Sequence, residues 1–202
     1  GEWYIDNPQR GLANNSVCYT EKPDFEAFVN EWQSLYQSKS GERGMFSRVA
    51  SQKQAAKNGR RDATFDFGTN PCSEIILRPY QFCNLSEVVV RATDTLADLK
   101  RKVRVAAILG TLQTTLTDFR YLRAIWKKNT EEESLLGVSL TGIMDHPVLS
   151  GRTNEVGDKG DYTTLTKWLD VLRKEAINTN AVWAERLGVT VSTAITAVKP
   201  SG

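Results

Sequence analysis

The segment 70–74 carries three side chains that could do chemistry together. Asn70, Cys72 and Glu74 supply an amide, a thiol and a carboxylate at alternate positions. Pro71 fixes its own φ and biases Asn70 towards extended backbone, so we expect a strand or strand-like loop rather than a helix. Alternate side chains of an extended segment lie on one face. The three groups would then meet one substrate as an orienting amide, a reactive thiol and a proton acceptor.

A second thiol, Cys83, follows a Pro79-Tyr80 break at which the chain can turn back. We expect Cys72 and Cys83 to face one pocket from two different segments. The plainer interpretation makes Cys72 a small buried side chain, because free cysteine is among the most buried residue types. The nearby carboxylate of Glu74 argues against this, since burying it on the same face without a partner would be costly.

Composition sets the class of protein that these residues belong to. The chain has 202 residues, of which 40% are hydrophobic and 25% charged, which is enough for one sizeable globular core. A net charge of +2 gives no basic field that would indicate a nucleic-acid partner. The 3 cysteines are too few for a secreted disulfide framework and favour a reducing compartment. Without a signal sequence or an apolar run that could span a bilayer, we predict a cytoplasmic location and no membrane partner.

The hydrophobic pattern alternates apolar strands with amphipathic helices, which is typical of βαβ units in a parallel sheet or barrel. We therefore predict the α/β class. The expected strands are 16–20, 75–77, 85–90, 135–140 and 192–198. The expected helices are 24–38, 47–57, 94–119 and 162–188. The first helix carries an aromatic stripe that includes Phe25, Trp32 and Tyr36, which we interpret as core.

Three weaker candidates lie outside segment 70–74. His146, the only histidine, sits between Asp145 and Pro147 and is interpreted as structural. The Arg60-Arg61 pair could meet phosphate but is better explained as a solvated turn. The last expected strand delivers 200–202 to its C-terminal edge, which is where α/β sheets place ligand sites.

These residues resemble the ribonucleotide reductases, and specifically their adenosylcobalamin-dependent branch. The resemblance rests on Thr-Asn-Pro-Cys-Ser-Glu-Ile at 69–75 and Gln-Phe-Cys-Asn-Leu at 81–85, and it extends to 11–17, 136–143 and 198–202. In that family an Asn-x-Cys-x-Glu run lies on a finger loop inside a ten-stranded α/β barrel. The resemblance implies that residues 1–202 are part of this catalytic barrel domain, with the Cys72 loop inside.

The resemblance also implies a role for each matching residue. Cys72 would become the thiyl radical with adenosylcobalamin as cofactor, and would take hydrogen from the 3′ carbon of the ribose. Glu74 would accept the proton of the 3′ hydroxyl, and Asn70 would hold the substrate. Cys83 would be one of two thiols that reduce the substrate as its 2′ hydroxyl leaves as water. The turn of Pro200, Ser201 and Gly202 would bind substrate phosphate, and no protein-bound metal is expected.

The implied partners are a ribonucleotide, with the triphosphate type favoured, a nucleotide effector bound outside these residues, and a thioredoxin-type reductant. In the family the partner of Cys83 comes from an N-terminal strand whose sequence context is not reproduced around Cys18. We therefore expect Cys18 to pack on the apolar face of its strand and the true partner to precede residue 1. The chain stops inside the expected phosphate turn, so we expect an internal fragment that needs the remainder of its polypeptide for activity.

Two alternatives remain open at this point. The first is the large subunit of an iron-dependent ribonucleoside-diphosphate reductase, which more often has Leu after the Asn and a longer gap between the cysteines. Pro71 and the short spacing from Cys72 to Cys83 argue against it. The second is a non-catalytic α/β nucleotide-binding module with both cysteines buried or joined in a disulfide. The accessibility of the thiols would distinguish it from a reductase.

Overall fold

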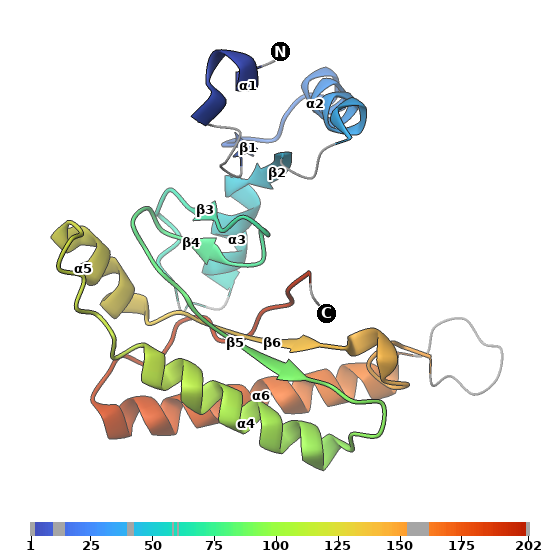
Figure 1. The fold of residues 1–202 in the computed structure, drawn as a ribbon, viewed down its shortest axis with the longest axis vertical. Helices are drawn as coiled ribbons and strands as arrows, with labels where there is room; N and C mark the ends of the chain where they lie inside the picture. The colour runs from blue at the N-terminus through green and yellow to red at the C-terminus, as the bar shows by residue number, and fades with distance from the viewer. Residues whose placement is uncertain are drawn as a thin grey trace. The chain divides into compact units, whose positions relative to one another are not determined.

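The computed structural model describes residues 3–9, 15–39, 43–57, 59, 61–152 and 162–200. The chain divides into two compact units, Gly1–Pro79 and Tyr80–Gly202. Both contain helices and strands, which confirms the predicted α/β class (Figure 1). The described residues form three two-stranded sheets, so a ten-stranded barrel is not seen among them.

The first unit is built around a parallel strand pair. β1 (Asn15–Tyr19) pairs with β2 (Arg43–Ser47), and the connection between them contains α2 (Phe25–Ser38). A short helix, α1 (Trp3–Asp6), precedes this pair. The carboxylate of Asp24 accepts a hydrogen bond from the Ala27 N–H at 2.7 Å and caps α2 where the sequence predicts. This strand, helix and parallel strand form the βαβ arrangement that the alternating pattern indicates.

The aromatic stripe on α2 is not core within the described residues, and that prediction is wrong. No residue of α2 is buried, and Phe25 and Tyr36 are 84% and 73% exposed. Trp32 and Tyr36 instead stack on each other, with ring centroids 5.8 Å apart. Helical spacing places apolar side chains on one face, but it does not determine what covers that face.

After α3 (Arg48–Lys57), the first unit ends in a short antiparallel hairpin. Ser47 caps α3, as predicted, because its hydroxyl accepts a hydrogen bond from Ala50 N–H at 3.2 Å. The hairpin consists of β3 (Gly68–Thr69) and β4 (Ile76–Leu77), with Thr69 opposite Ile76. The loop between these strands contains the Asn-Pro-Cys-Ser-Glu segment.

The second unit packs two long helices on one face of a parallel strand pair (Figure 1). β5 (Asn84–Val89) pairs with β6 (Leu136–Thr141), and α4 (Leu96–Gln113) and α6 (Thr163–Leu187) cover them. The core joins both strands to both helices and includes Val88, Leu99, Val103, Leu136, Val138, Leu172 and Ala176. All four elements were predicted, although α4 begins after a capping box of Thr95 and Asp98, slightly later than expected.

The last predicted strand is only partly formed. Residues 194–197 join β6 by backbone hydrogen bonds, with Val138 N–H donating to the Ile195 carbonyl at 2.8 Å. Only an isolated bridge between Val138 and Thr196 is regular enough to count as β-structure. The helix α5 (Ala124–Glu133) was not predicted, because its buried residues are polar and leave no apolar stripe.

His146 is structural, in agreement with its interpretation from sequence. Its ring is buried, and Nδ1 accepts hydrogen bonds from the N–H groups of Val148 and Leu149 at 3.1 and 3.2 Å. Nε2 lies 2.9 Å from the Asp94 carbonyl oxygen, to which it donates in the tautomer that these bonds require. With both ring nitrogens engaged, His146 fixes the loop after β6.

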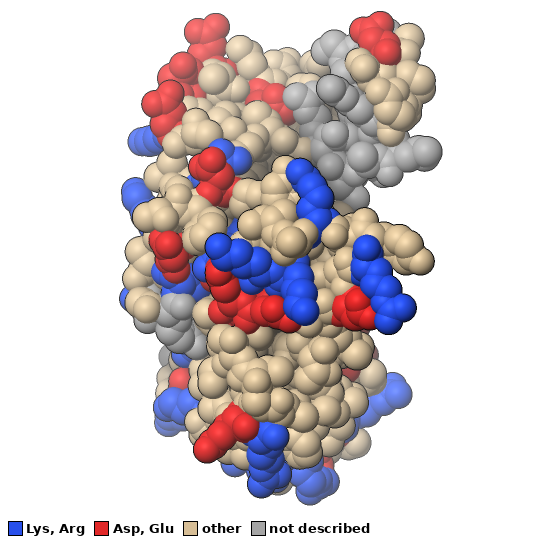
Figure 2. Space-filling view, turned by 90° about the vertical axis from the view of Figure 1, so that its left-hand side faces the viewer, with Lys and Arg blue, Asp and Glu red and all other residues tan. Residues whose placement is uncertain are grey.

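The surface carries no large field of one sign on the face that Figure 2 shows, where acidic and basic side chains are interspersed. This agrees with the net charge of +2. None of the helices in the described ranges has the length and apolar character needed to cross a bilayer.

Candidate functional site

Asn70, Cys72 and Glu74 lie in the tight loop between β3 and β4. The N–H of Ser73 donates to the Asn70 carbonyl at 3.0 Å, which closes a β-turn with Pro71 and Cys72 at its centre. Ser73 then adopts a left-handed conformation with φ of 64°. The prediction that residues 70–74 form an extended segment is therefore wrong. The three residues therefore belong to one compact loop and do not alternate along a strand.

The side chain of Asn70 holds the base of this loop. Its Oδ1 accepts a hydrogen bond from the Ile75 N–H at 3.0 Å, and the backbone N–H of Asn70 donates to the Ile75 carbonyl at 3.3 Å. The amide oxygen is thus committed to the loop, whereas the Nδ2 group can donate to a ligand. Asn70 can therefore both fix the loop and orient a bound molecule.

Cys72 and Glu74 differ in exposure: the thiol is exposed, whereas the carboxylate oxygens are buried. The Cys72 thiol is free and exposed at the turn. Both carboxylate oxygens of Glu74 are buried, and neither accepts a hydrogen bond within the described part of the chain. A buried carboxylate without a partner is costly. Glu74 is therefore well suited to accept a hydrogen bond or a proton from a bound ligand.

Two arginines and one phenylalanine brace the hairpin that carries the loop. Phe67 is fully buried, and the Arg61 guanidinium lies 4.8 Å from its ring centroid. Arg61 Nη1 also donates to the Ile76 carbonyl at 3.0 Å, and Arg48 Nε donates to the Phe67 carbonyl at 2.9 Å. The interpretation of Arg61 as a solvated turn residue is wrong, because it supports β4. Arg60 lies outside the described residues.

A cavity of about 300 Å³ lies beside the loop within the first unit. Its lining includes Asn70, Pro71, Thr69, Cys18 and Arg48. Cys18 is exposed and free, so the prediction that it packs on the apolar face of its strand is wrong. Sequence reasoning also missed Arg48, because only the pairing of β1 with β2 brings these distant segments to one cavity.

The remaining predicted site residues belong to the second unit. Cys83 is a half-buried cysteine directly before β5 and forms no disulfide. Pro200 is exposed, while Ser201 and Gly202 lie outside the described residues. That Cys83 faces the Cys72 loop stays a prediction. The non-catalytic alternative with Cys72 and Cys83 joined in a disulfide is not seen, since neither cysteine forms one.

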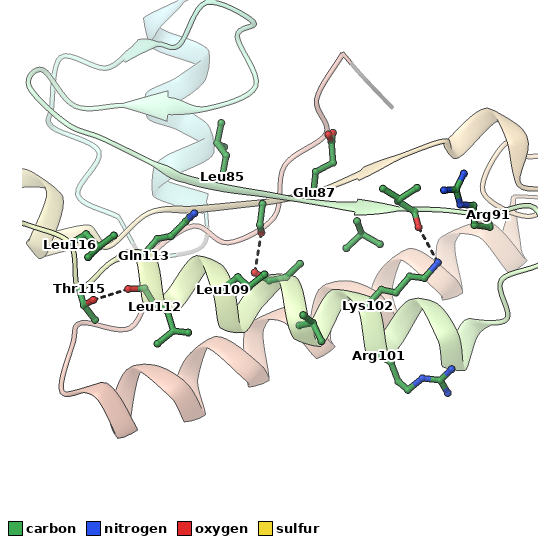
Figure 3. Close-up of a pocket in the computed structure, with 15 residues that line it drawn as sticks. Leu85, Glu87, Arg91, Arg101, Lys102, Leu109, Leu112, Gln113, Thr115 and Leu116 are labelled. Carbon is green, nitrogen blue, oxygen red and sulfur yellow. Dashed lines mark hydrogen bonds between the residues drawn. The ribbon is translucent and has the colours of Figure 1, made fainter.

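A groove of about 1050 Å³ lies between β5 and α4 in the second unit (Figure 3). Its floor is apolar, with Leu109 and Leu112 53% and 39% exposed on α4. Lys102 lies at one end, where Nζ donates to the Val89 carbonyl at 3.0 Å and to Asp94 at 2.6 Å. None of the predicted site residues lines this groove.

Comparison with known proteins identifies relatives of this loop-bearing chain. The adenosylcobalamin-dependent ribonucleoside-triphosphate reductase of Lacticaseibacillus paracasei is 30% identical over 213 residues, covering 96% of this chain. The chain belongs to the adenosylcobalamin-dependent ribonucleotide reductase family. It spans 27% of the length of that relative. No family model matches the sequence.

Further comparisons agree with this reductase assignment. The enzymes of the same name from Lactobacillus gasseri and Lactobacillus helveticus are 28% and 33% identical, over 96% and 67% of this chain. These alignments cover 28% and 20% of the two relatives. A crystal structure of a B12-dependent (class II) ribonucleotide reductase superposes with a TM-score of 0.58 and 20% identity. The superposition covers 93% of this chain and 32% of the chain in the crystal structure, which shows that the two share a fold.

Proposed function

We propose that this reductase chain is part of an enzyme that reduces ribonucleoside triphosphates to 2′-deoxyribonucleotides by a thiyl-radical mechanism, in the cytoplasm, for DNA precursor synthesis. One observation carries the proposal. The exposed Cys72 thiol and the unpartnered Glu74 carboxylate occupy the same loop, in a chain whose relatives are named for this activity. Because the chain spans 27% of such a relative, the remainder of the polypeptide would complete the enzyme.

Each residue of the loop would have a distinct task. As a thiyl radical, Cys72 would abstract the hydrogen atom from the 3′ carbon of the ribose. Glu74 would accept the proton of the 3′ hydroxyl, which supplies the partner that its buried oxygens lack. Asn70 would donate from Nδ2 to the substrate while its Oδ1 keeps the loop closed.

The reduction itself needs two electrons and a leaving group. Cys83 and a second thiol would provide the electrons and end as a disulfide, while the 2′ hydroxyl takes a proton and leaves as water. The hydrogen abstracted by Cys72 would return to the 3′ carbon, which restores the thiyl radical. A thioredoxin-type reductant would then reduce the disulfide.

Adenosylcobalamin is the cofactor named for the relatives, and the loop fits it because the Cys72 thiol is accessible at the turn. When bound, this cofactor supplies the radical through homolysis of its carbon–cobalt bond. The turn of Pro200, Ser201 and Gly202 would bind the phosphates of the substrate. A nucleotide effector would bind outside these residues, and neither nucleic acid nor a membrane is a partner.

The test is the Cys72→Ser variant of the full-length enzyme. A hydroxyl cannot replace a thiol as a hydrogen-atom carrier, so nucleotide reduction should fall to background. Nucleotide binding, measured by equilibrium dialysis, should remain near the wild-type value because the loop is held by Asn70 and Ile75. Appreciable turnover by the variant would exclude the proposed role.

A further inference from the structure

The helix α5 has a buried face that is polar and lies outside the hydrophobic core. The buried residues of this helix are Asn129, Thr130 and Glu133, and Glu133 is only 1% exposed. Burying such groups is costly unless each finds a hydrogen-bond partner. The partners of this face therefore show which segment α5 holds in place.

All three buried residues of α5 accept hydrogen bonds from Gln81 and Phe82. Gln81 Nε2 donates to the Asn129 carbonyl at 3.1 Å and to Glu133 Oε2 at 2.7 Å. The Phe82 N–H donates to Thr130 Oγ1 at 3.3 Å. Hydrogen bonds to a carboxylate are stronger than those between neutral groups, so the bond from Gln81 to Glu133 is the main anchor.

Aromatic packing holds the same segment against α5. The Phe82 ring stacks on Trp126 of this helix, with the ring centroids 4.7 Å apart. It also meets Phe119 edge-on, at 5.1 Å between centroids. Both the backbone and the side chain of Phe82 are therefore fixed, and the chain enters Cys83 from a defined direction.

Asn84, on the other side of Cys83, is anchored where α5 gives way to β6. Its backbone N–H and its Nδ2 donate to the Leu135 carbonyl at 2.9 and 3.2 Å. Leu135 is buried and lies between α5 and β6. Both chain neighbours of Cys83 are thus tied to one continuous stretch, 129–135. Because Cys83 lies directly between these anchors, this stretch sets the position of its backbone.

We propose that Gln81, Thr130 and Glu133 are positioning residues that hold the Cys83 thiol where it reduces the substrate. This inference rests on the proposed function, in which Cys83 and a second thiol give up two electrons and end as a disulfide. None of the three would touch the substrate. Misplacing a reacting group by about 1 Å can cost about 10²-fold in rate. Loss of the polar face of α5 should therefore slow the reducing step and spare nucleotide binding.

The test compares Thr130→Val with Thr111→Val in the prereduced full-length enzyme. Each variant removes one hydroxyl from a buried threonine on a helix of the second unit. Thr111 bonds to Ala107 and Asn180 and serves as the matched control. Thr130→Val should lower the rate of single-turnover reduction by about ten-fold. Thr111→Val should leave that rate unchanged, even if its melting temperature falls.

A second set of variants tests the anchor between Gln81 and Glu133. Gln81→Met keeps the length of the side chain but removes the donor, and should lower the single-turnover rate by about 10- to 100-fold. Glu133→Leu removes the acceptor and should have the same effect. Glu133→Gln keeps an oxygen that can accept, so its rate should stay within a few-fold of wild type. Nucleotide binding, measured by equilibrium dialysis, should be unchanged in every variant.

Mass spectrometry of the peptide that contains Cys83 measures disulfide formation in the same turnover, which should fall in step with product. Should Glu133→Leu or Thr130→Val not fold, Gln81→Met decides the question from outside the helix. Wild-type rates in Gln81→Met, or equal losses in Thr130→Val and Thr111→Val, would overturn the inference. A loss in Glu133→Gln as large as in Glu133→Leu would refute the role of Glu133 as an acceptor. A wild-type enzyme that forms no deoxyribonucleotide would instead refute the proposed function.

Discussion

The side-chain oxygen of Asn70 accepts a hydrogen bond from the backbone N–H of Ile75 at 3.0 Å, across the loop that carries Cys72 and Glu74. This contact ties the first residue of the loop to the last. The two polar atoms of the Asn70 amide therefore have different tasks. The oxygen maintains the loop, and the nitrogen remains able to donate to a substrate.

Two substitutions of Asn70 should therefore have different effects. Asn70→Ala removes both halves of the amide and leaves only backbone bonds across the loop, so the loop should loosen and activity should be lost. Asn70→Asp keeps an acceptor for the Ile75 N–H but loses the donor, so the loop should persist while activity falls. Hydrogen exchange of the Ile75 amide reports on the loop, and turnover reports on the donor. Full activity of Asn70→Asp would show that Nδ2 does not bind the substrate.

Glu74→Gln should lower the rate of reduction by about 10²–10⁴, the usual range for loss of a general base. The amide retains the shape of the side chain but cannot accept the proton of the 3′ hydroxyl. Steady-state kinetics with the full-length enzyme would measure the loss. A rate within a few-fold of wild type would mean that another group accepts the proton.

The two remaining cysteines can be distinguished by single-turnover reduction with the prereduced full-length enzyme. Cys83→Ala should abolish product formation, because Cys83 is proposed to supply one of the reducing thiols. Cys18→Ala should still form product, although Cys18 lines the cavity beside Asn70. Loss of single-turnover activity in Cys18→Ala would identify Cys18 as the missing redox partner.

Acid should weaken the contact between α4 and α6 through Glu175. Arg104 Nε lies 2.7 Å from Glu175 Oε1 and Lys100 Nζ lies 3.5 Å from Oε2. The hydrogen bond from Arg104, together with both positive charges, lowers the pKa of Glu175 below its usual 4.5, although partial burial opposes the shift. A lowered folded-state pKa means that this stabilisation is present above pH 4.5 and is lost as the pH falls through the folded value.

The corresponding measurement is the melting temperature of wild type and Glu175→Gln at pH 7 and at pH 3. The variant should be less stable at pH 7 and should lose less stability on acidification. Asp170→Asn is the matched control, because Asp170 on the same helix forms an ion pair with the exposed Lys174 of that helix and not with α4 within the described residues. Equal acid sensitivity of Glu175→Gln and wild type would contradict the prediction.

The sequence by itself determined the elements whose signals are local. The caps at Asp24 and Ser47, the helices α4 and α6, and the strands β5 and β6 all follow from side-chain spacing and from hydrogen bonds within a few residues. The chemical inventory of Asn70, Cys72 and Glu74 could also be predicted, because residue type and order need no coordinates. Helix periodicity and capping depend on neighbours in the chain, which the sequence displays directly.

Only the tertiary structure decided how these groups are presented. The hydrogen bond from the Ser73 N–H to the Asn70 carbonyl makes a turn of the expected strand, and the pairing of β1 with β2 brings Cys18 to the cavity beside Asn70. The exposure of α2, the missing partner of Glu74 and the bond from Gln81 to Glu133 likewise depend on segments distant in sequence. Local preferences cannot specify which distant segments meet, because that choice is made by packing and hydrogen bonding across the whole fold.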